Sequence, residues 1–335
     1  MASYVPGNGD EEVSLELPLV QLAKDLREAS AALRPFEARY VVDTYYQAQH
    51  YRIQAGAQKK ASEKHGEPHR LVSWIGMSMN RFESALRSSL AVFANTYRLG
   101  NWLQAHVGVG PVLAAAMLAN LDIRHARTVG HFWRFCGLDP TCKWEKGKKR
   151  PWNARMKSIC AFKLGECFVK FQNHKGPDGQ PDCFYGQLFA AKKAALTAQN
   201  ESGGFREQAQ QEMARAEANG SAAKMRNNKT RKIKDLTGAE KEVAARWSYW
   251  EQGKLCPAHV HDRARRWTVK LFMSHMHHVM YWDYFRQTPP APYVFEHPEL
   301  GDHRHLIDPP LFDPETYRAT YEGKDLRELV GQLDD

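Results

Sequence analysis

The chain has 335 residues, 43% hydrophobic and 25% charged, so it holds enough apolar material for one or two folded domains. Its formal net charge of +9 favours an anionic partner, because Lys and Arg side chains that neutralise phosphates release condensed counterions. Acidic residues stand where a secretion signal carries positive charge, and no apolar run reaches the roughly 18 residues that cross a bilayer, so we expect a cytoplasmic protein without membrane contact.

Helical spacing dominates the first hundred residues. Apolar side chains recur every three or four residues in three segments, which are residues 14–34, 35–53 and 71–99. The apolar stripe of the third segment is predicted to be core. Few β-branched residues alternate anywhere in the chain, so the sequence predicts a mainly α fold, a helical bundle without a large sheet.

Two glycines form a tight turn between helical patterns in the segment His106-Val-Gly-Val-Gly-Pro111. Gly108 and Gly110 let the backbone turn sharply and approach another chain closely. The first N–H groups of the second helix are suited to a phosphate. The pattern predicts a helix-hairpin-helix motif that binds nucleic-acid backbone and carries no sequence information. An ordinary link between antiparallel helices is the alternative.

A strongly basic segment follows this hairpin, with Glu145 as its only acid. Its seven cations are Lys143, Lys146, Lys148, Lys149, Arg150, Arg155 and Lys157. Because one carboxylate cannot pair with seven cations, the segment predicts a cationic surface, held in place by a helix that begins at Pro151. We expect this surface to adjoin the turn at 108–111 and to hold a sugar-phosphate chain there. A solvated basic loop is the alternative.

The order of these elements resembles a known domain. A Gly-x-Gly-Pro hairpin, a helix, a Gly-Leu-x-Pro turn at 137–140, a Lys/Gly/Arg-rich loop and a further helix follow one another over about residues 100–172. This order resembles the C-terminal domain of the insertion-sequence transposases that include the pilin-gene invertases. The resemblance implies DNA strand exchange in transposition or inversion, with bound metal and, in some members, a guide RNA.

Two departures from this family concern catalysis. The family's N-terminal, Holliday-junction-resolvase-like domain supplies four carboxylates, whereas residues 14–99 are predicted as helices here and Asp43 lies in a helical pattern. The family also places a nucleophilic Ser shortly after the Gly-Leu-x-Pro turn, where Thr141 is the only hydroxyl. Catalytic residues therefore stay unknown, and no metal or cofactor is expected. Mg²⁺ is expected only if the chain is an active recombinase with Thr141 or Ser158 as nucleophile.

Two further basic elements favour nucleic acid as the partner. The run at 224–234, which includes Lys229, Arg231 and Lys232, predicts an arm that becomes ordered on DNA. The last strong helix, from about residue 258, carries a basic stripe at three- and four-residue spacing, formed by Arg263, Arg266 and Lys270. A solvated helix face or linker is the alternative for both elements.

The predicted organisation has five parts: a disordered terminus (1–12), a helical region (13–100), the helix-hairpin-helix domain (101–175), a helical region with the basic arm (176–288) and an irregular Pro-rich tail (289–335). The leading hypothesis is a DNA-binding protein of a mobile element, acting on double-stranded or branched DNA. An active recombinase and a non-enzymatic structural or assembly protein are the alternatives. RNA as partner, a homo-oligomer, and a zinc site at Cys256, His259 and His261 stay open.

Overall fold

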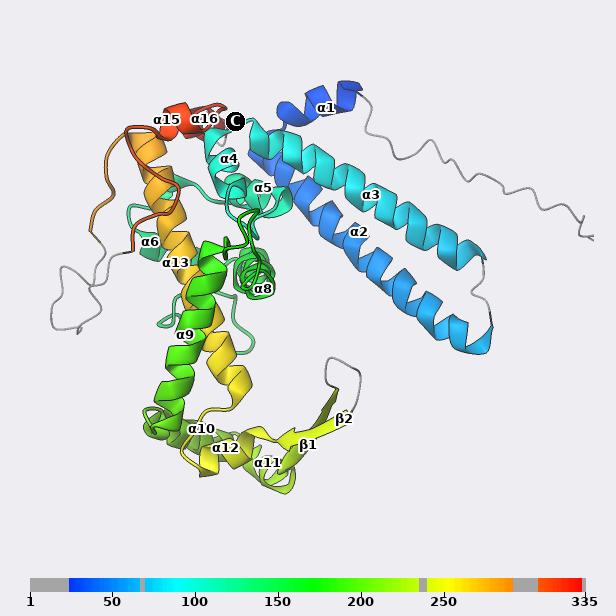
Figure 1. The fold of residues 1–335 in the computed structure, drawn as a ribbon, viewed down its shortest axis with the longest axis vertical. Helices are drawn as coiled ribbons and strands as arrows, with labels where there is room; N and C mark the ends of the chain where they lie inside the picture. Colours follow the sequence, from blue (N-terminus) through cyan, green and yellow to red (C-terminus); the bar gives the residue numbers. More distant parts are fainter. Residues whose placement is uncertain (1–23, 67–69, 235–239, 292–306, 333–335) are drawn as a thin grey trace, which may run out of the picture. The chain divides into compact units, whose positions relative to one another are not determined.

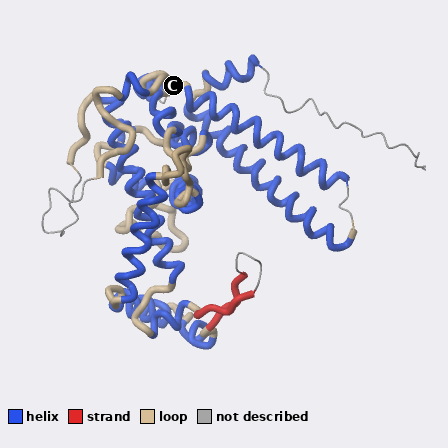
Figure 2. The backbone as a smooth tube through the Cα atoms, viewed as in Figure 1, coloured by secondary structure: helices blue, strands red, loops and turns tan. Residues whose placement is uncertain are grey.

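The structure is a computed structural model that describes residues 24–66, 70–234, 240–291 and 307–332. The fold is mainly α, as predicted, and the described residues contain one small antiparallel sheet (Figures 1 and 2). The described chain divides into two units. The first contains the residues up to 93 apart from 34–36, and the second contains 34–36 and everything from 94 onwards. The finer domain boundaries given above stay a prediction.

A pair of long antiparallel helices forms most of the first unit. Its elements are α1 (Lys24–Ala31), α2 (Pro35–Ser62), η2 (Glu63–His65) and α3 (Arg70–Asn95). Glu83 of α3 is buried, accepts a hydrogen bond from Gln49 Nε2 of α2 at 3.1 Å and forms an ion pair with Arg52. Nearer the other end of the pair, Gly76 lies against Ala55, which lets the two helices pack closely.

The apolar stripe on α3 is only partly core. Leu90 and Phe93 are fully buried, but Ile75 and Phe82 are 38% and 39% exposed. The prediction of a continuous buried stripe was therefore wrong for the first half of α3. The physical reason is that packing against one neighbouring helix covers only a narrow strip of a helix surface.

The second unit is organised around the 29-residue helix α13 (Pro257–Phe285), which begins with a proline in its first turn. It packs along α9 (Phe184–Glu201), beside which it runs in Figure 1. The other elements of this core are α4 (Arg98–Gln104), α5 (Pro111–Asn120), η3 (Ile123–His125), α6 (Val129–Phe135), α7 (Ala154–Lys157), the π-helix η4 (Ser158–Leu164) and α8 (Gly165–Lys170). α7, η4 and α8 follow one another without a break.

Residues 206–251 fold into a smaller group of elements. They are α10 (Arg206–Ala218), α11 (Ala222–Asn227), β1 (Thr230–Lys234), β2 (Glu240–Ala244) and α12 (Arg246–Glu251). Trp247 and Trp250 of α12 are buried among alanines of α10 and α11. The run 224–234, which we predicted as an arm, spans α11 and β1. β1 pairs antiparallel with β2, with Arg231 opposite Val243 and Lys232 opposite Glu242.

The C-terminal tail differs from its prediction. Part of it, residues 292–306, lies outside the described residues. Residues 307–316 are irregular, but α15 (Tyr317–Thr320) and α16 (Leu326–Gly331) follow, so the prediction of an irregular tail was wrong from Tyr317 onwards. Buried apolar side chains explain the ordering: Tyr317 and Leu326 are fully buried, and the Leu326 N–H donates to the buried carboxylate of Asp283 on α13 at 2.9 Å.

Candidate nucleic-acid interface

The predicted hairpin is the turn between α4 and α5. Gly108 has a positive φ of 98°, a backbone conformation that favours glycine, and a Cβ at this position would lie 3.5 Å from the Phe168 ring. Gly110 precedes α5 with an ordinary extended backbone and is exposed. The turn is therefore packed on one side against α8 and open to solvent on the other.

Most backbone donors at the start of α5 are already used. Pro111 has no N–H group, and the N–H groups of Leu113 and Ala114 both donate to the Gly110 carbonyl at 3.0 Å. Among the first residues of α5 and its cap, this leaves the N–H groups of Gly110 and Val112 for an external acceptor. The donor cluster is thus smaller than the sequence suggests.

Aromatic and histidine side chains fill the core behind the hairpin. His106 donates through Nδ1 to the Trp102 carbonyl at 2.8 Å, and burial lowers its pKa. His275 of α13 accepts a hydrogen bond from the Tyr185 hydroxyl at 2.8 Å and donates to the Ile307 carbonyl at 2.7 Å. Burial lowers the pKa of His275 to about 4. His277 has the same depressed pKa for the same reason. The histidines of this part of α13 are neutral packing groups.

The basic segment forms a closed loop between α6 and α7. Gly137 adopts a left-handed conformation with φ 61°, and a Cβ there would meet Lys157 at 2.8 Å and Trp152 at 3.0 Å. The Asn153 N–H donates to the Phe135 carbonyl at 2.9 Å. These contacts hold the two ends of the loop together, so its cations are presented from a fixed base.

The loop's cations face solvent. Lys143, Lys146, Lys148, Lys149, Arg150 and Arg155 are all exposed. Lys148 pairs with Glu145 at 2.8 Å, but both side chains are more than 70% exposed, and such a pair contributes only about 0–1 kcal/mol. The Arg150 guanidinium lies 5.3 Å from the centre of the Trp144 ring. The loop therefore carries far more positive charge than its single acid neutralises.

The loop meets the basic stripe of α13 at Lys157. The ammonium of Lys157 lies 4.0 Å from the centre of the Trp152 ring. Burial lowers the pKa of Lys157, and the positive charges of Arg150 and Arg266 lower it further. Arg266 is exposed. Arg150 of the loop and Arg266 of α13 are thus both close enough to Lys157, at the end of α7, for their charges to repel its ammonium group.

The stripe itself extends from Lys270 back to His259, because positions 259, 263, 266 and 270 recur on one helix face. Its members differ in how they are held. Lys270 covers the Trp133 ring at 4.1 Å, and Arg263 donates to Gln208 Oε1 at 2.5 Å and covers the Phe205 ring. Burial lowers the pKa of His259; the negative charge of Glu212 raises this pKa, and the positive charges of Arg266, Arg263 and Arg246 lower it further, so the imidazole is favoured in its neutral form. We call Arg150, Lys157, Arg266 and Arg263 the cationic track.

The hairpin and the base of the basic loop contact different parts of the helix formed by α7, η4 and α8. The loop base contacts Lys157, at the end of α7, whereas Gly108 contacts Cys167 and Phe168 in α8. Lys157 and Cys167 are ten positions apart in a continuous helix that includes the π-helix η4, so more than two helical turns separate the two contact points. The expectation that they form one joint surface is therefore not met directly. The loop's charged neighbours lie on α13.

The sites predicted on the arm have different environments. Lys229 is exposed, and its carbonyl accepts hydrogen bonds from the Ala245 N–H at 2.8 Å and the Ser248 hydroxyl at 2.9 Å. Lys232 lies 3.5 Å from Glu240 on the neighbouring strand. Arg231 is exposed opposite Val243. These residues lie on the β1–β2 hairpin, and the structure shows no direct contact between them and the loop.

The two candidate nucleophiles are exposed. The Thr141 hydroxyl donates to Asp139 Oδ1 at 2.7 Å, and this hydrogen bond lowers the pKa of Asp139. A carboxylate with a lowered pKa is a weaker base, which does not favour deprotonation of Thr141. Ser158 begins the π-helix η4. Within the described residues, no three His, Cys, Asp or Glu side chains gather as a metal site would require.

The possible zinc ligands also point apart. Cys256 is buried before α13, and His261 packs its ring against Phe189 at 5.2 Å. His259 is two residues away on the same helix, so the two imidazoles lie on different faces. This geometry does not bring the three side chains together.

The segment with the hairpin and the loop matches a known family. Residues 100–158 match the transposase IS116/IS110/IS902 family. The predicted relationship to transposases is therefore confirmed for this segment, which includes the whole basic loop. Neither the curated proteins nor the solved structures give a match. α13 and the β1–β2 hairpin lie outside the segment that matches the transposase family. No helix of the described chain has the length and apolar character needed to cross a bilayer.

Sequence reasoning missed one member of the cationic track as a separate site residue. Lys157 was counted only as one of the loop's seven cations, without its neighbour on α13. The approach of Lys157 to Arg266 spans more than a hundred residues and left no local trace.

Proposed function

We propose that the chain is a DNA-binding protein of a mobile genetic element, and that it holds the sugar-phosphate backbone on the basic loop and the cationic track. Two kinds of observation support this. The loop belongs to the segment related to transposases, which makes DNA the expected partner. Its exposed Lys and Arg side chains provide the charge that phosphate contacts require.

The convergence of Arg150, Lys157 and Arg266 carries the proposal. Three like charges in one place destabilise each other: burial lowers the pKa of Lys157, and the charges of Arg150 and Arg266 lower it further. A phosphate between them would relieve the repulsion and accept charge-assisted hydrogen bonds. An arrangement that is unfavourable alone thus becomes favourable with an anion bound.

The expected ligand is double-stranded or branched DNA, read through its backbone and not its sequence. The loop offers several cations in a row, which suits a continuous chain of phosphates better than a single small anion. The N–H groups of Gly110 and Val112 stay a predicted second contact, separate from the base of the loop. RNA binding and a homo-oligomer are outcomes that the same experiments would reveal.

The test is the salt dependence of binding to a blunt DNA duplex. The wild-type affinity should fall steeply as the salt concentration rises. In the triple variant Lys148→Gln, Lys149→Gln, Arg150→Gln, the slope of log affinity against log salt concentration should be smaller by the equivalent of about two to three phosphate contacts. A charge-matched control is Lys59→Gln, Lys60→Gln, Lys64→Gln, whose lysines are exposed in the first unit. It should keep the wild-type slope.

Three results would contradict the proposal. They are a flat salt response of the wild type, equal losses in the loop variant and its control, or no binding to any nucleic acid. The last would favour a structural or assembly protein. Incubation with supercoiled DNA and Mg²⁺ tests the recombinase alternative, because nicked or covalently attached DNA requires a nucleophile whereas backbone binding leaves the DNA unaltered.

A further inference from the structure

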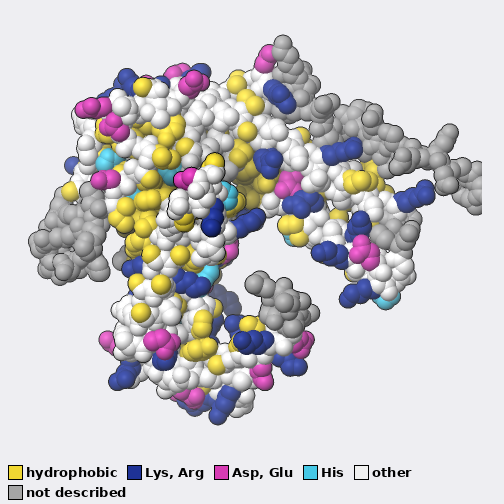
Figure 3. Space-filling view, in the orientation of Figure 1, with side chains coloured by type: hydrophobic (Ala, Val, Ile, Leu, Met, Phe, Trp, Pro, Cys, Tyr) yellow, Lys and Arg dark blue, Asp and Glu magenta, His cyan; other side chains and the backbone are white. Residues whose placement is uncertain are grey.

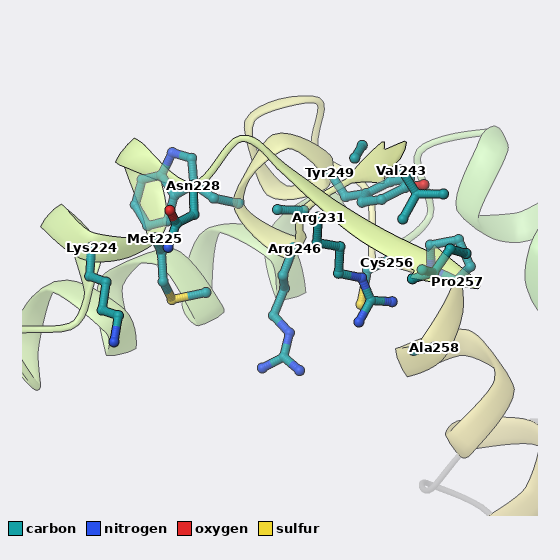
Figure 4. A pocket seen from close by; sticks show the side chains of 14 residues that line it. Lys224, Met225, Asn228, Arg231, Val243, Arg246, Tyr249, Cys256, Pro257 and Ala258 are labelled. Atoms are coloured by element: carbon teal, nitrogen blue, oxygen red, sulfur yellow. The ribbon is translucent and has the colours of Figure 1, made fainter. Parts of the chain in front are cut away.

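A pocket lies between the β1–β2 hairpin and the helices next to it, outside the segment that matches the transposase family. Its volume is about 440 Å³. Residues of α11, β1, β2, α12 and the first turn of α13 line it (Figure 4). The same part of the molecule shows Lys and Arg side chains beside apolar ones in Figure 3.

The charge at this pocket is entirely positive among the residues that line it. Lys224, Arg231 and Arg246 contribute their side chains, and no carboxylate is among the lining residues. All three are exposed. Figure 4 shows their charged ends extending to the same side of the pocket. They therefore present a cationic rim to solvent.

The register of the β-hairpin explains why this rim keeps its charge. Successive residues of a strand point to opposite faces. On one face Lys232 pairs with Glu240 at 3.5 Å, and Thr230 donates a hydrogen bond to Glu242. Arg231 lies on the other face and has Val243 as its partner across the sheet. Both acids of β2 are thus directed away from the pocket.

The inner wall of the pocket is apolar and partly aromatic. Ile233 shares the Arg231 face of β1 and is 37% exposed, although it lies in an otherwise polar strand. Met225, Val243 and Tyr249 add to this wall, and all three are partly accessible. A cationic rim beside an accessible apolar wall suits a ligand with one anionic part and one flat, weakly polar part.

We propose that this pocket binds one unpaired nucleotide of a DNA strand, with its phosphate on Lys224, Arg231 and Arg246 and its base against Ile233 and Tyr249. The inference rests on the proposed function, since it takes DNA as the partner. Volumes of about 300–1,000 Å³ are typical of sites for ligands of small-molecule size. One nucleotide fits such a space, but a double helix does not.

The cationic track connects the duplex site to this pocket. Arg246 borders the pocket, and its charge acts on His259 together with the charges of Arg263 and Arg266 and the opposite charge of Glu212. Positive groups therefore continue from the basic loop through Arg266 and Arg263 of α13 towards Arg246 at the rim, with His259, whose lowered pKa favours the neutral imidazole, beside them. A strand that leaves a duplex held on the loop would meet these cations in turn.

The experiment compares a blunt duplex with the same duplex carrying a short single-stranded overhang. The wild type should bind the overhang DNA more tightly. Arg231→Gln should weaken binding to the overhang DNA on the order of fivefold, the loss of one charge-assisted phosphate contact, and leave blunt-duplex binding within about twofold. Lys232→Gln, on the same strand and the opposite face, is the matched control and should not discriminate between the two DNAs.

Arg246→Gln provides a second variant on a different element, so that a local defect of the hairpin cannot imitate the result. It should reproduce the selective loss. Equal affinity of the wild type for both DNAs, or equal effects of Arg231→Gln and Lys232→Gln, would overturn the pocket proposal while leaving blunt-duplex binding intact. Failure of the wild type to bind either DNA would instead overturn the proposed function and the pocket with it.

Discussion

The hairpin at 105–110 and the basic loop at 141–152 lie in the same segment related to transposases, yet they use their residues differently. The hairpin's positive-φ glycine packs against α8, and the N–H groups of Leu113 and Ala114 are satisfied by Gly110. The loop is tied at its base and leaves its cations in solvent. The hairpin is therefore mainly a packing element, and the loop is mainly a charged surface.

The comparison teaches that a glycine-rich turn and an excess of charge are different kinds of evidence. Glycine is required wherever the backbone must adopt a positive φ or lie close to another group, whether that group is a ligand or a neighbouring helix. An excess of cations has no such internal use, because clustered like charges destabilise a fold that binds no anion. Of the two signals, the charge is the better indicator of a binding site.

The largest expected effect concerns packing of the hairpin's first helix. A Cβ at Gly100 of α4 would lie 2.0 Å from the Ala94 carbonyl oxygen, so Gly100→Ala forces backbone apart and should lower the free energy of unfolding by about 3 kcal/mol. A Cβ at Gly110 meets no atom within 4 Å. Gly110→Ala should therefore change stability by less than about 0.5 kcal/mol. Denaturant unfolding followed by tryptophan fluorescence measures both.

Gly110→Ala also tests the comparison itself. If the hairpin is chiefly a packing element, this variant should bind a blunt duplex like the wild type. A clear loss of affinity in a variant of unchanged stability would show that the exposed backbone at Gly110 touches DNA, and the contrast between hairpin and loop would fail.

The second effect is a loss of stability at low pH, caused by two buried histidines in the core behind the hairpin. His275 and His277 have pKa values of about 4 in the folded protein, against an ordinary value of 6.5. Between these values the unfolded chain binds more protons than the folded one, so stability must fall as the pH falls from about 7 towards 4, and it changes no further for these groups below that. The loss between pH 7 and pH 5 should be about 2 kcal/mol for each histidine.

Unfolding curves at several pH values in the wild type and in His277→Gln measure this effect. Gln does not titrate and can still donate to the Ala126 carbonyl, which His277 Nε2 contacts at 2.7 Å. The variant should thus be less stable at pH 7 but depend less on pH. A pH dependence identical to that of the wild type would mean that His277 titrates normally in the fold.

Local features of the fold were predictable from the sequence. Periodic apolar residues located α2 and α3, and the two glycines located the turn before α5, whereas the helix expected from Pro151 begins at Ala154. The exposed half of α3 was not predictable, because periodicity shows that a face is apolar and not that a partner covers it. Burial of Tyr317 and Leu326 likewise depends on α13 and on no local pattern.

The candidate site was predictable only in part. Charge counting identified the loop and the α13 stripe separately, but the proximity of Lys157 to Arg266 depends on how η4, which continues α7, packs beside α13. The pocket was not predictable at all, since its wall depends on the pairing of β1 with β2. Among the described residues, Lys232 forms an ion pair with Glu240, whereas Arg231 lies opposite Val243. The spacing of cations along the sequence does not reveal this difference.

The smallest expected effect is that of Arg266→Gln on duplex binding, which tests whether the DNA held on the loop extends to α13. Arg266 lies outside the segment that matches the transposase family. Because its side chain is exposed, Arg266→Gln should change the free energy of unfolding by less than about 0.5 kcal/mol. The slope of log affinity for a blunt duplex against log salt concentration should fall by the equivalent of about one phosphate contact. Lys324→Gln removes an equal charge from a half-exposed lysine near the C-terminus and should leave the slope unchanged. If Arg266→Gln behaves like this control, the DNA stays on the loop and does not reach α13. The hairpin, and not α13, would then be the next element to test beside the loop.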